Sequence, residues 1–444
     1  MAEKRGKRQS PTSSKPAPPR KAAAPKENRL DLLRKKLELE QELLEKGGTA
    51  RQKELEKVEK AYEKSSEAAP AREPEEEPSL KESLAHAEHA DATETVKDLI
   101  GQAQEQSAAA EHPVAPEQKK SIQKAVLAYC KLFERVKEEV GKLIVGQEGA
   151  MKGLFRALIA DGHVLVEGVP GVAETALIRA LAKTTQCSFS RIQFTPDLLP
   201  TDIIGISTYQ EGRGFYTLKG PIFNNFVLAD EINRAPPKVQ SALLESMAEK
   251  QATIAKESFP VPLPFFTMAT QNPLENVGTY SLPEAQVDRF LFKIYMGYPT
   301  IDEEERILRS NLSEKGFDQY DIKPVLNPDL ILEIQQLAKR IYVDRKVEKY
   351  IVKLIDATRS PKKYGVGLGK YVEYGASPRG SIGLFNSAKA EALLLGQTYV
   401  TPHHVKTIAH DVLRHRLILS YEGQAEGVKP EQVIDEILKK VPVP

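Results

Sequence analysis

The sequence predicts an α/β domain built on a five-stranded, mainly parallel sheet, followed by an all-helical domain and preceded by an N-terminal extension. Five short apolar runs, separated by helical or loop segments, recur between residues 144 and 297, which is typical of a parallel sheet covered by helices on both faces. Beyond Tyr298-Pro299 the apolar residues repeat at helical spacing. A length of 444 residues is more than one domain usually needs.

The N-terminal extension divides into three segments. Residues 1–28 are rich in Lys, Arg, Pro, Ala and Ser and bury too little apolar surface to offset chain entropy, so we predict a disordered basic tail. Residues 29–66 place leucines at heptad-like spacing, which fits a short coiled coil or an amphipathic helix pair. Residues 67–115 carry prolines, an acidic run and an Ala/Gln-rich stretch, and we expect a linker there.

We expect the α/β domain to span residues 116–300. Apolar residues from Ile122 to Val140 recur at spacings of three and four, which predicts an opening helix with one apolar face. The five expected strands are His163–Glu167, Phe189–Phe194, Phe226–Ala229, Phe265–Ala269 and Phe290–Met296. Two expected hairpins interrupt the pattern, one pairing Ile206–Gln210 with Phe215–Leu218 and one centred on Thr253–Glu257.

Residues 301–444 are expected to form the all-helical domain. The apolar stripes that predict its helices lie around Ile331–Ile341, Val347–Ala357, Ile382–Leu395 and Val405–Leu413. The bends between these helices carry prolines and glycines such as Pro361, Gly365 and Pro402.

Composition excludes several classes of protein. The formal net charge is +1, so the whole molecule has no general attraction for nucleic acid or an anionic membrane. No apolar run is long enough for a membrane span, and no apolar stretch follows the basic N-terminus as in a secretory signal. Cys130 and Cys187 lie far apart without metal-ligand spacing, which indicates ordinary thiols in a reducing cytoplasm rather than a zinc or iron–sulfur site.

The residues Gly-Val-Pro-Gly-Val-Ala-Glu-Thr that follow the first expected strand precede an expected helix, which is the context of a phosphate-binding loop. In such a loop backbone N–H groups wrap the phosphates, a lysine reaches the β/γ-phosphates, and a Ser/Thr hydroxyl binds Mg²⁺. The pattern is met at Gly168, Gly171 and Thr175, whereas Ala173 and Glu174 replace its last glycine and its lysine. An ordinary βα turn is the alternative for this segment.

The electrostatic effect of the charge reversal at Glu174 is large enough to weaken binding of an anionic ligand. A pair of unit charges about 4 Å apart is worth roughly 4 kcal/mol at an effective dielectric near 20. This is an upper bound for repulsion of an anionic ligand, because glutamate is shorter than lysine and can swing into water. Ala173 adds a steric cost if the backbone there needs a positive φ.

Polar side chains follow two further strands and one helix start. Asp230 and Glu231 end an apolar strand, where one carboxylate can hold Mg²⁺ and the next can polarise a water. Asn272 ends another strand and suits the orientation of that water. Arg289 and Arg379 could clamp phosphate charge. The alternatives are a solvated strand end for the carboxylates and surface salt bridges for the arginines.

Together these motifs resemble the MoxR-type AAA+ ATPases, and the resemblance covers about residues 130–444. The strings that carry it are Ile144-Val-Gly-Gln147, Gly162-His-Val-Leu-Val-Glu-Gly-Val-Pro-Gly171, Arg191-Ile-Gln-Phe-Thr-Pro-Asp-Leu-Leu-Pro200, Gly220-Pro-Ile-Phe223, Ala229-Asp-Glu-Ile-Asn-Arg-Ala-Pro-Pro237, Gln240-Ser-Ala-Leu-Leu-Glu245, Ala269-Thr-Gln-Asn-Pro273 and Gly278-Thr-Tyr-Ser-Leu-Pro-Glu-Ala-Gln286.

The resemblance implies an AAA+ P-loop domain with a helical lid, assembled in a ring, usually a hexamer, with ATP and Mg²⁺ between subunits. It implies phosphate contacts from Gly168, Gly171, Ala173, Glu174, Thr175 and Ala176, adenine contacts near Val145 and Gly146, Mg²⁺ at Thr175 and Asp230, water activation by Glu231, a polar sensor at Asn272, a finger toward a neighbour at Arg289, and a lid sensor closing on the phosphates at Arg379. It also implies a chaperone-like remodeller whose two hairpins touch client proteins, often with von Willebrand factor A-domain partners.

Three interpretations of the altered loop stay open. The chain could be an active ATPase in which another cation replaces the lysine, because the other catalytic groups are retained. It could be a pseudo-ATPase scaffold or adaptor that supplies Arg289 to an active paralogue, which the charge reversal favours. It could also bind nucleotide without turnover. A DNA-associated AAA+ remodeller is a separate alternative that only the basic tail supports.

Overall fold

The computed structural model describes residues 116–169, 171, 173–212, 214–272, 279–310 and 320–444. The predicted basic tail, helical segment and linker, residues 1–28, 29–66 and 67–115, lie outside the described residues. In the part that is described, no helix combines the length and the apolar character that crossing a membrane requires. The boundary between the domains at residue 300 stays a prediction.

A five-stranded sheet in the order β2-β5-β8-β1-β9 forms the centre of the α/β domain, and every neighbouring pair is parallel. Its strands are β1 (Val164–Gly168), β2 (Phe189–Gln193), β5 (Phe226–Asp230), β8 (Phe266–Gln271) and β9 (Phe292–Met296). The five predicted strands are therefore confirmed. Because the strands are parallel, their carboxyl ends meet at one edge of the sheet, which we call the carboxyl edge, and their starts meet at the amino edge.

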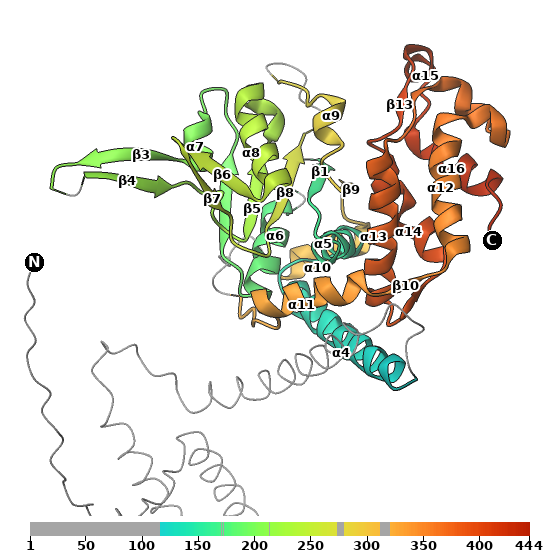
Figure 1. The fold of residues 1–444 in the computed structure, drawn as a ribbon, viewed down its shortest axis with the longest axis horizontal. Helices are drawn as coiled ribbons and strands as arrows, with labels where there is room; N and C mark the ends of the chain where they lie inside the picture. The colour runs from blue at the N-terminus through green and yellow to red at the C-terminus, as the bar shows by residue number, and fades with distance from the viewer. Residues whose placement is uncertain (1–115, 170, 172, 213, 273–278, 311–319) are drawn as a thin grey trace, which may run out of the picture. The chain divides into compact units, whose positions relative to one another are not determined.

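Helices cover both faces of this sheet (Figure 1). The described helices of the domain are α4 (Pro116–Gly141), α5 (Glu148–Ile159), α6 (Glu174–Thr184), α7 (Pro200–Ile204), α8 (Pro237–Glu249) and α9 (Glu284–Val287). Successive strand residues point to opposite faces. Val164 and Val166 accordingly join a core with Leu154 of α5, whereas Leu165 joins a second core with Leu243 of α8.

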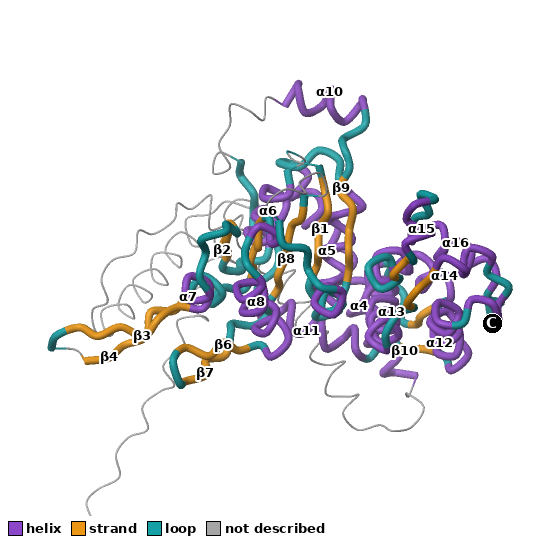
Figure 2. The backbone as a smooth tube through the Cα atoms, turned by 90° about the horizontal axis from the view of Figure 1, so that it is seen from above, coloured by secondary structure: helices purple, strands orange, loops and turns teal. Residues whose placement is uncertain are grey.

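Two antiparallel hairpins extend from the domain, as predicted. The first pairs β3 (Gly205–Gln210) with β4 (Gly214–Lys219), and the second pairs β6 (Gln251–Ile254) with β7 (Glu257–Pro260). Figures 1 and 2 show the β3–β4 hairpin reaching well beyond the sheet. Its base is tight, because Gly205 has φ +104° and a Cβ there would overlap the Leu218 carbonyl oxygen.

The helical lid is confirmed. Its helices are α10 (Ile301–Ser310), α11 (Pro328–Lys339), α12 (Arg345–Arg359), α13 (Pro378–Leu394), α14 (Pro402–Leu413), α15 (Tyr421–Ala425) and α16 (Pro430–Lys440). Its described residues also form the short strands β10 (Tyr342–Val343), β11 (Val372–Tyr374), β12 (Tyr399–Val400) and β13 (Ile418–Leu419), which pair as β10-β12 and β11-β13. Strands of two or three residues are too short to show an alternating pattern in the sequence.

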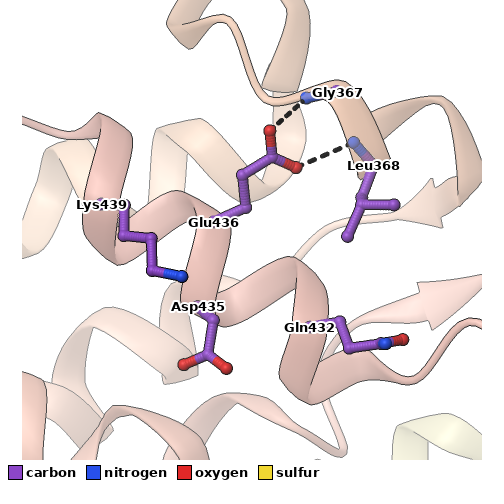
Figure 3. Close-up of a pocket in the computed structure, with 6 residues that line it drawn as sticks. All are labelled: Gly367, Leu368, Gln432, Asp435, Glu436 and Lys439. Carbon is purple, nitrogen blue, oxygen red and sulfur yellow. Dashed lines mark hydrogen bonds between the residues drawn. The ribbon is translucent and has the colours of Figure 1, made fainter.

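Two hydrogen bonds to one side chain fix a glycine-containing bend of the lid. The carboxylate of Glu436 on α16 accepts the N–H groups of Gly367 and Leu368 at 2.7 and 2.9 Å (Figure 3). These two bonds satisfy the free N–H groups at the start of a 3₁₀ turn. The glycine-containing bend is therefore attached to the last helix of the lid.

A buried ion pair connects the α/β domain to the lid. Arg156 on α5 donates from Nε and Nη2 to the two carboxylate oxygens of Glu391 on α13, at 2.5 and 3.0 Å. Gln335 on α11 also donates to the Leu158 carbonyl oxygen at 2.7 Å. Both side chains of the ion pair are almost fully buried, so removing one partner would leave a buried charge without compensation.

Candidate functional site

The predicted phosphate loop joins β1 to α6 at the carboxyl edge of the sheet. Gly171 has φ +88°, and Ala173 directly before α6 has φ +68° and ψ +28°. The left-handed region is free for glycine but costs a residue with a Cβ about 1–2 kcal/mol. The positive φ that we considered at this position is therefore present, and the loop holds an alanine in a backbone shape suited to glycine.

The carboxylate of Glu174 lies inside this loop. A Cβ built on Gly168 would collide with Oε1 of Glu174, so the side chain folds back across the end of β1. Burial first, and then the negative charges of Asp230 and Glu231, raise the pKa of Glu174 to about 7. A group that sits among other carboxylates and resists ionisation is the opposite of the lysine that the phosphate-loop pattern requires.

Asp230, the last residue of β5, is buried and held by two neighbours. Its Oδ1 accepts the Thr270 hydroxyl at 2.7 Å, and its Oδ2 accepts Nη2 and Nε of Arg191 at 2.6 and 3.0 Å. Arg191 lies on β2, the strand beside β5. The guanidinium of Arg191 is therefore bonded to Asp230 rather than to Glu174.

Glu231 follows Asp230 in the left-handed region, with φ +55°. Its backbone N–H donates to the Thr270 hydroxyl at 2.9 Å, and its Oε2 accepts Nε2 of Gln193 at 2.6 Å. The Nε of Arg234 lies 3.2 Å from the same oxygen. Thr270 therefore links the two acidic residues through one hydroxyl.

Sequence reasoning missed Thr270, Arg191, Gln193 and Arg234 as partners of the acidic pair. The signal that could have found them is positional. Arg191 and Gln193 are two residues apart near the end of β2, so their side chains point to the same face. Thr270 lies on β8, the strand beside β5. All three belong to strings that carried the family resemblance, but their contacts depend on the order of strands in the sheet.

Asn272 directly follows β8 at the same edge. The register pairs Gln271 with Glu167 of β1, so Asn272 comes next to the residue level of Gly168. Thr175 and Ala176 lie in the first turn of α6 and are partly exposed. The carboxyl edge thus brings together the loop, the acidic pair and Asn272, and their roles stay predictions.

The oxygen atoms at this edge fit Mg²⁺ held together with phosphate. Mg²⁺ usually takes one or two carboxylates, waters and substrate phosphate oxygens rather than an all-protein cage. Thr175 and Asp230 offer a hydroxyl and a carboxylate of this kind. The described residues contain no group of three or more His, Cys, Asp and Glu placed to bind a metal.

Val145 and Gly146, the predicted adenine contacts, line a pocket of about 170 Å³. Its walls include Met151 of α5, together with Glu303 and Arg306 of α10. Gln147 connects this pocket to the carboxyl edge, because its Nε2 donates to the carbonyl oxygen of Gly297 at 2.9 Å, directly after β9. Charged side chains from α4, α5 and α10 line the pocket beside its apolar residues, and the adenine contact stays a prediction.

Arg289 and Arg379 lie at the other edge of the sheet. Both line a pocket of about 340 Å³ that also includes His163, directly before β1. β1 runs from this pocket to the phosphate loop, and five residues at about 3.3 Å each separate the two by about 16 Å. The structure therefore places Arg379 at the edge opposite the phosphate loop of its own chain, and its role as a lid sensor that closes on phosphates stays a prediction.

Two hydrogen bonds explain the position of these arginines. The Ser377 hydroxyl, at the start of α13, donates to Oδ2 of Asp288 at 2.9 Å, which holds Arg379 beside the turn that carries Arg289. Nη1 of Arg289 donates to the Leu244 carbonyl oxygen at 2.9 Å. We call Arg289 and Arg379 together the arginine face. Both side chains are exposed.

The neighbouring His163 adds no positive charge to the arginine face. Burial lowers the pKa of His163 to about 4. Its Nδ1 accepts the N–H of Thr267 at 3.1 Å, and its Nε2 lies 3.2 Å from the Met247 carbonyl oxygen, so a proton on Nε2 satisfies both contacts. The ring is therefore a neutral structural group.

Comparisons with known proteins agree with this arrangement. Residues 163–292 match the ATPase family associated with various cellular activities (AAA), and residues 369–437 match the AAA lid domain. The chain is 46% identical over 314 residues to Chaperone MoxR1 of Mycobacterium tuberculosis, covering 70% of this chain and 82% of that protein. It is 30% identical over 332 residues to Protein MoxR of Methylorubrum extorquens, covering 70% and 94%. A crystal structure of a candidate ATPase from Cytophaga hutchinsonii superposes with a TM-score of 0.69 at 45% identity, covering 74% of this chain and 99% of that one.

Proposed function

The chain belongs to the MoxR family of AAA+ ATPases, and from this premise we propose that it is a ring subunit that drives a neighbour's nucleotide site more effectively than its own. In this proposal the arginine face of one chain reaches the phosphates of ATP and Mg²⁺ held at the carboxyl edge of the next subunit. Its own phosphate loop binds nucleotide weakly. The ring, a hexamer in this proposal, remodels client proteins in the cytoplasm.

The observation that carries the proposal is the opposite placement of the two kinds of group. The loop and the acidic pair lie at the carboxyl edge, whereas Arg289 and Arg379 line a pocket at the amino edge. In a closed ring of identical or related subunits, a heterologous interface brings two different faces together. Guanidinium groups supplied by a neighbour are an effective way to stabilise charge that develops during phosphoryl transfer.

The weakness of the chain's own loop rests on Glu174. Its carboxylate lies across Gly168 and feels the charges of Asp230 and Glu231, so an incoming triphosphate would meet further negative charge. Arg191 is paired to Asp230 and does not replace the missing lysine in the loop. The loss of the attractive group and the gain of a repulsive one act in the same direction.

A second candidate function, an ATPase active in its own right, is favoured by the raised pKa of Glu174. With a pKa of about 7 the side chain keeps its proton in part at neutral pH, and a protonated carboxyl group can donate a hydrogen bond to a phosphate oxygen. Asp230, Glu231 and Asn272 are retained at the carboxyl edge. In this case the chain would hydrolyse ATP slowly, and more slowly as the pH rises.

The β3–β4 hairpin supports a role on protein clients. Ile206, Tyr209, Phe215 and Leu218 are all exposed on it, and Phe215 has 80% of its surface accessible. Apolar side chains gathered on one projecting element mark surfaces that contact other proteins. Von Willebrand factor A-domain proteins are the partner class that the family resemblance suggests, and we keep them as part of the proposal.

The proposal can be tested by mixing two forms of the full chain. The donor is the unmodified chain. The receptor carries Ala173→Gly and Glu174→Lys, which rebuild the loop, together with Arg289→Ala and Arg379→Ala, which remove the arginine face. Each form alone should hydrolyse ATP poorly, and the mixture should hydrolyse it at least about tenfold faster, because removal of a trans arginine costs about 10³–10⁵ in kcat.

Two controls make the result decisive. A donor with Arg289→Ala and Arg379→Ala should not activate the receptor, whereas a donor with Arg309→Ala and Arg345→Ala, two other exposed arginines, should activate it normally. If the unmodified chain alone turns over ATP and Glu231→Gln abolishes that turnover, the second candidate function replaces the first.

A further inference from the structure

Arg416, which follows α14 in the lid, is clamped to the segment that precedes β9 in the α/β domain. Its side chain is 3% exposed. Its Nε donates to Oδ1 of Asp288 at 2.8 Å, its Nη2 to the Phe290 carbonyl oxygen at 2.7 Å, and its Nη1 to the Leu291 carbonyl oxygen at 3.1 Å. One guanidinium of the lid therefore holds the turn that contains Arg289.

Asp288 uses its second carboxylate oxygen to hold the start of α13. Its Oδ2 accepts the Ser377 hydroxyl at 2.9 Å, and the same hydroxyl accepts the backbone N–H of Arg379 at 3.1 Å. Ser377 is thus the N-cap of the helix that carries Arg379. We call Asp288, Ser377 and Arg416 the junction.

The junction joins the backbones of the two arginines while leaving their side chains exposed. Asp288 directly precedes Arg289, and Ser377 stands two residues before Arg379. Among the described charged residues that line the pocket, Arg416 pairs with Asp288 and Lys250 pairs with Asp161. No carboxylate among the described residues is paired with Arg289 or Arg379. The two cations whose spacing is fixed are therefore the two that remain available to an anion.

We propose that Asp288 is a positioning residue that fixes the spacing of Arg289 and Arg379, so that the lid and the α/β domain present both guanidiniums to one phosphate group of a neighbouring subunit's nucleotide. The proposal rests on the proposed function, because it assumes that the arginine face acts in trans. A purely structural role is the alternative, since a buried ion pair is by itself weak evidence for any particular purpose.

The physical reason for a positioning role lies in the geometry of charge stabilisation. Arginines that act on a transition state have to be placed within a fraction of an ångström, and a displacement of about 1 Å can cost about 10²-fold in rate. Arg289 belongs to the α/β domain and Arg379 to the lid, so a relative movement of the two domains would separate them. A carboxylate bonded to both elements removes that freedom.

The test uses the donor–receptor mixture described above, with the junction altered only in the donor. Asp288→Ala and Ser377→Ala donors should each lower the kcat of the mixture about tenfold and leave its KM for ATP unchanged, because ATP is bound by the receptor. Ser377→Ala keeps the Arg416–Asp288 ion pair, so it decides the matter if the Asp288→Ala donor fails to fold or to join the ring.

A double-mutant comparison separates positioning from general structural support. In a donor that already carries Arg379→Ala, adding Ser377→Ala should change the kcat no further, because the residue it positions is gone. The matched control is Asp435→Asn, an acidic lid residue in a separate pocket (Figure 3) that is paired with His410, and this donor should activate the receptor fully.

The outcomes distinguish the two proposals. If the unmodified donor does not activate the receptor, the trans arginine face is wrong and the positioning role falls with it. If the unmodified donor works and the Ser377→Ala donor works equally well, or if its loss adds in full to that of Arg379→Ala, the positioning role is overturned while the proposed function stands.

Discussion

Replacing Glu174 by glutamine should stabilise the protein at alkaline pH and leave its stability at acid pH unchanged. Burial and repulsion from Asp230 and Glu231 raise the pKa of Glu174 from 4.5 to about 7. At about 1.36 kcal/mol for each unit of pKa, this difference corresponds to at most about 3.4 kcal/mol. Because the side chain is partly exposed, solvent screening reduces the expected gain to about 1–2 kcal/mol.

The sign of this effect follows from the two pKa values. The unfolded chain releases the Glu174 proton near pH 4.5, while the folded chain keeps it up to about pH 7. Between these values the unfolded state binds fewer protons than the folded state, so the free energy of unfolding falls as the pH rises. Glutamine does not ionise and avoids this loss. The gain from Glu174→Gln is therefore absent below about pH 4.5 and complete above about pH 7.

Urea unfolding at about pH 4.5 and about pH 8 measures the two limits. Circular dichroism is a suitable signal because the chain has no tryptophan. Glu257→Gln, at an exposed position on β7, is the matched control and should give no pH-dependent difference. An equal effect of Glu174→Gln at both pH values would refute the view that a buried charge among carboxylates sets the stability of this loop.

Further predictions concern the loop, the acidic pair and the domain contact. Ala173→Gly should raise the free energy of unfolding by about 1 kcal/mol, because glycine adopts the left-handed region without strain; combined with Glu174→Lys it should also restore binding of fluorescent ATP with Mg²⁺, and binding equal to that of the unmodified chain would contradict the charge argument. Thr270→Val should cost about 1–3 kcal/mol in urea unfolding, since the carboxylate of Asp230 and a backbone N–H lose their shared hydroxyl. Arg156→Ala should cost about 3–5 kcal/mol because the buried carboxylate on α13 loses its partner, and a thermal midpoint equal to that of the unmodified chain would show that the ion pair contributes nothing.

The strands and the carboxyl edge could be predicted because their signals are local. Each strand is a short apolar run, and a parallel sheet brings all carboxyl ends to one side. That rule alone predicts that Gly168, Asp230 and Asn272 lie together. The same local reasoning identified Ala173 as a position where a positive φ would matter, and the backbone there has φ +68°.

The position of the lid could not be predicted in this way. The sequence shows where its helices begin and end, but contacts between distant segments decide which edge of the sheet they approach. Glu391 lies 235 residues from Arg156, and Arg416 lies 128 residues from Asp288. Neither pair has a periodic signal, so the sequence could not show that Arg379 approaches the amino edge rather than the phosphate loop.

Because the two edges are separate, the absence of the loop lysine affects the phosphate loop and not the arginine face. If one chain held every catalytic group around its own nucleotide, Glu174 would disable all of them together. In the proposed ring, with the loop at one edge and the arginine face at the other, a chain can lose the first function and keep the second, because different neighbours would complete the two sites. The retention of Arg289, Arg379 and the junction that connects them is then expected of a subunit whose contribution is made across an interface, and the donor–receptor mixture measures that contribution directly.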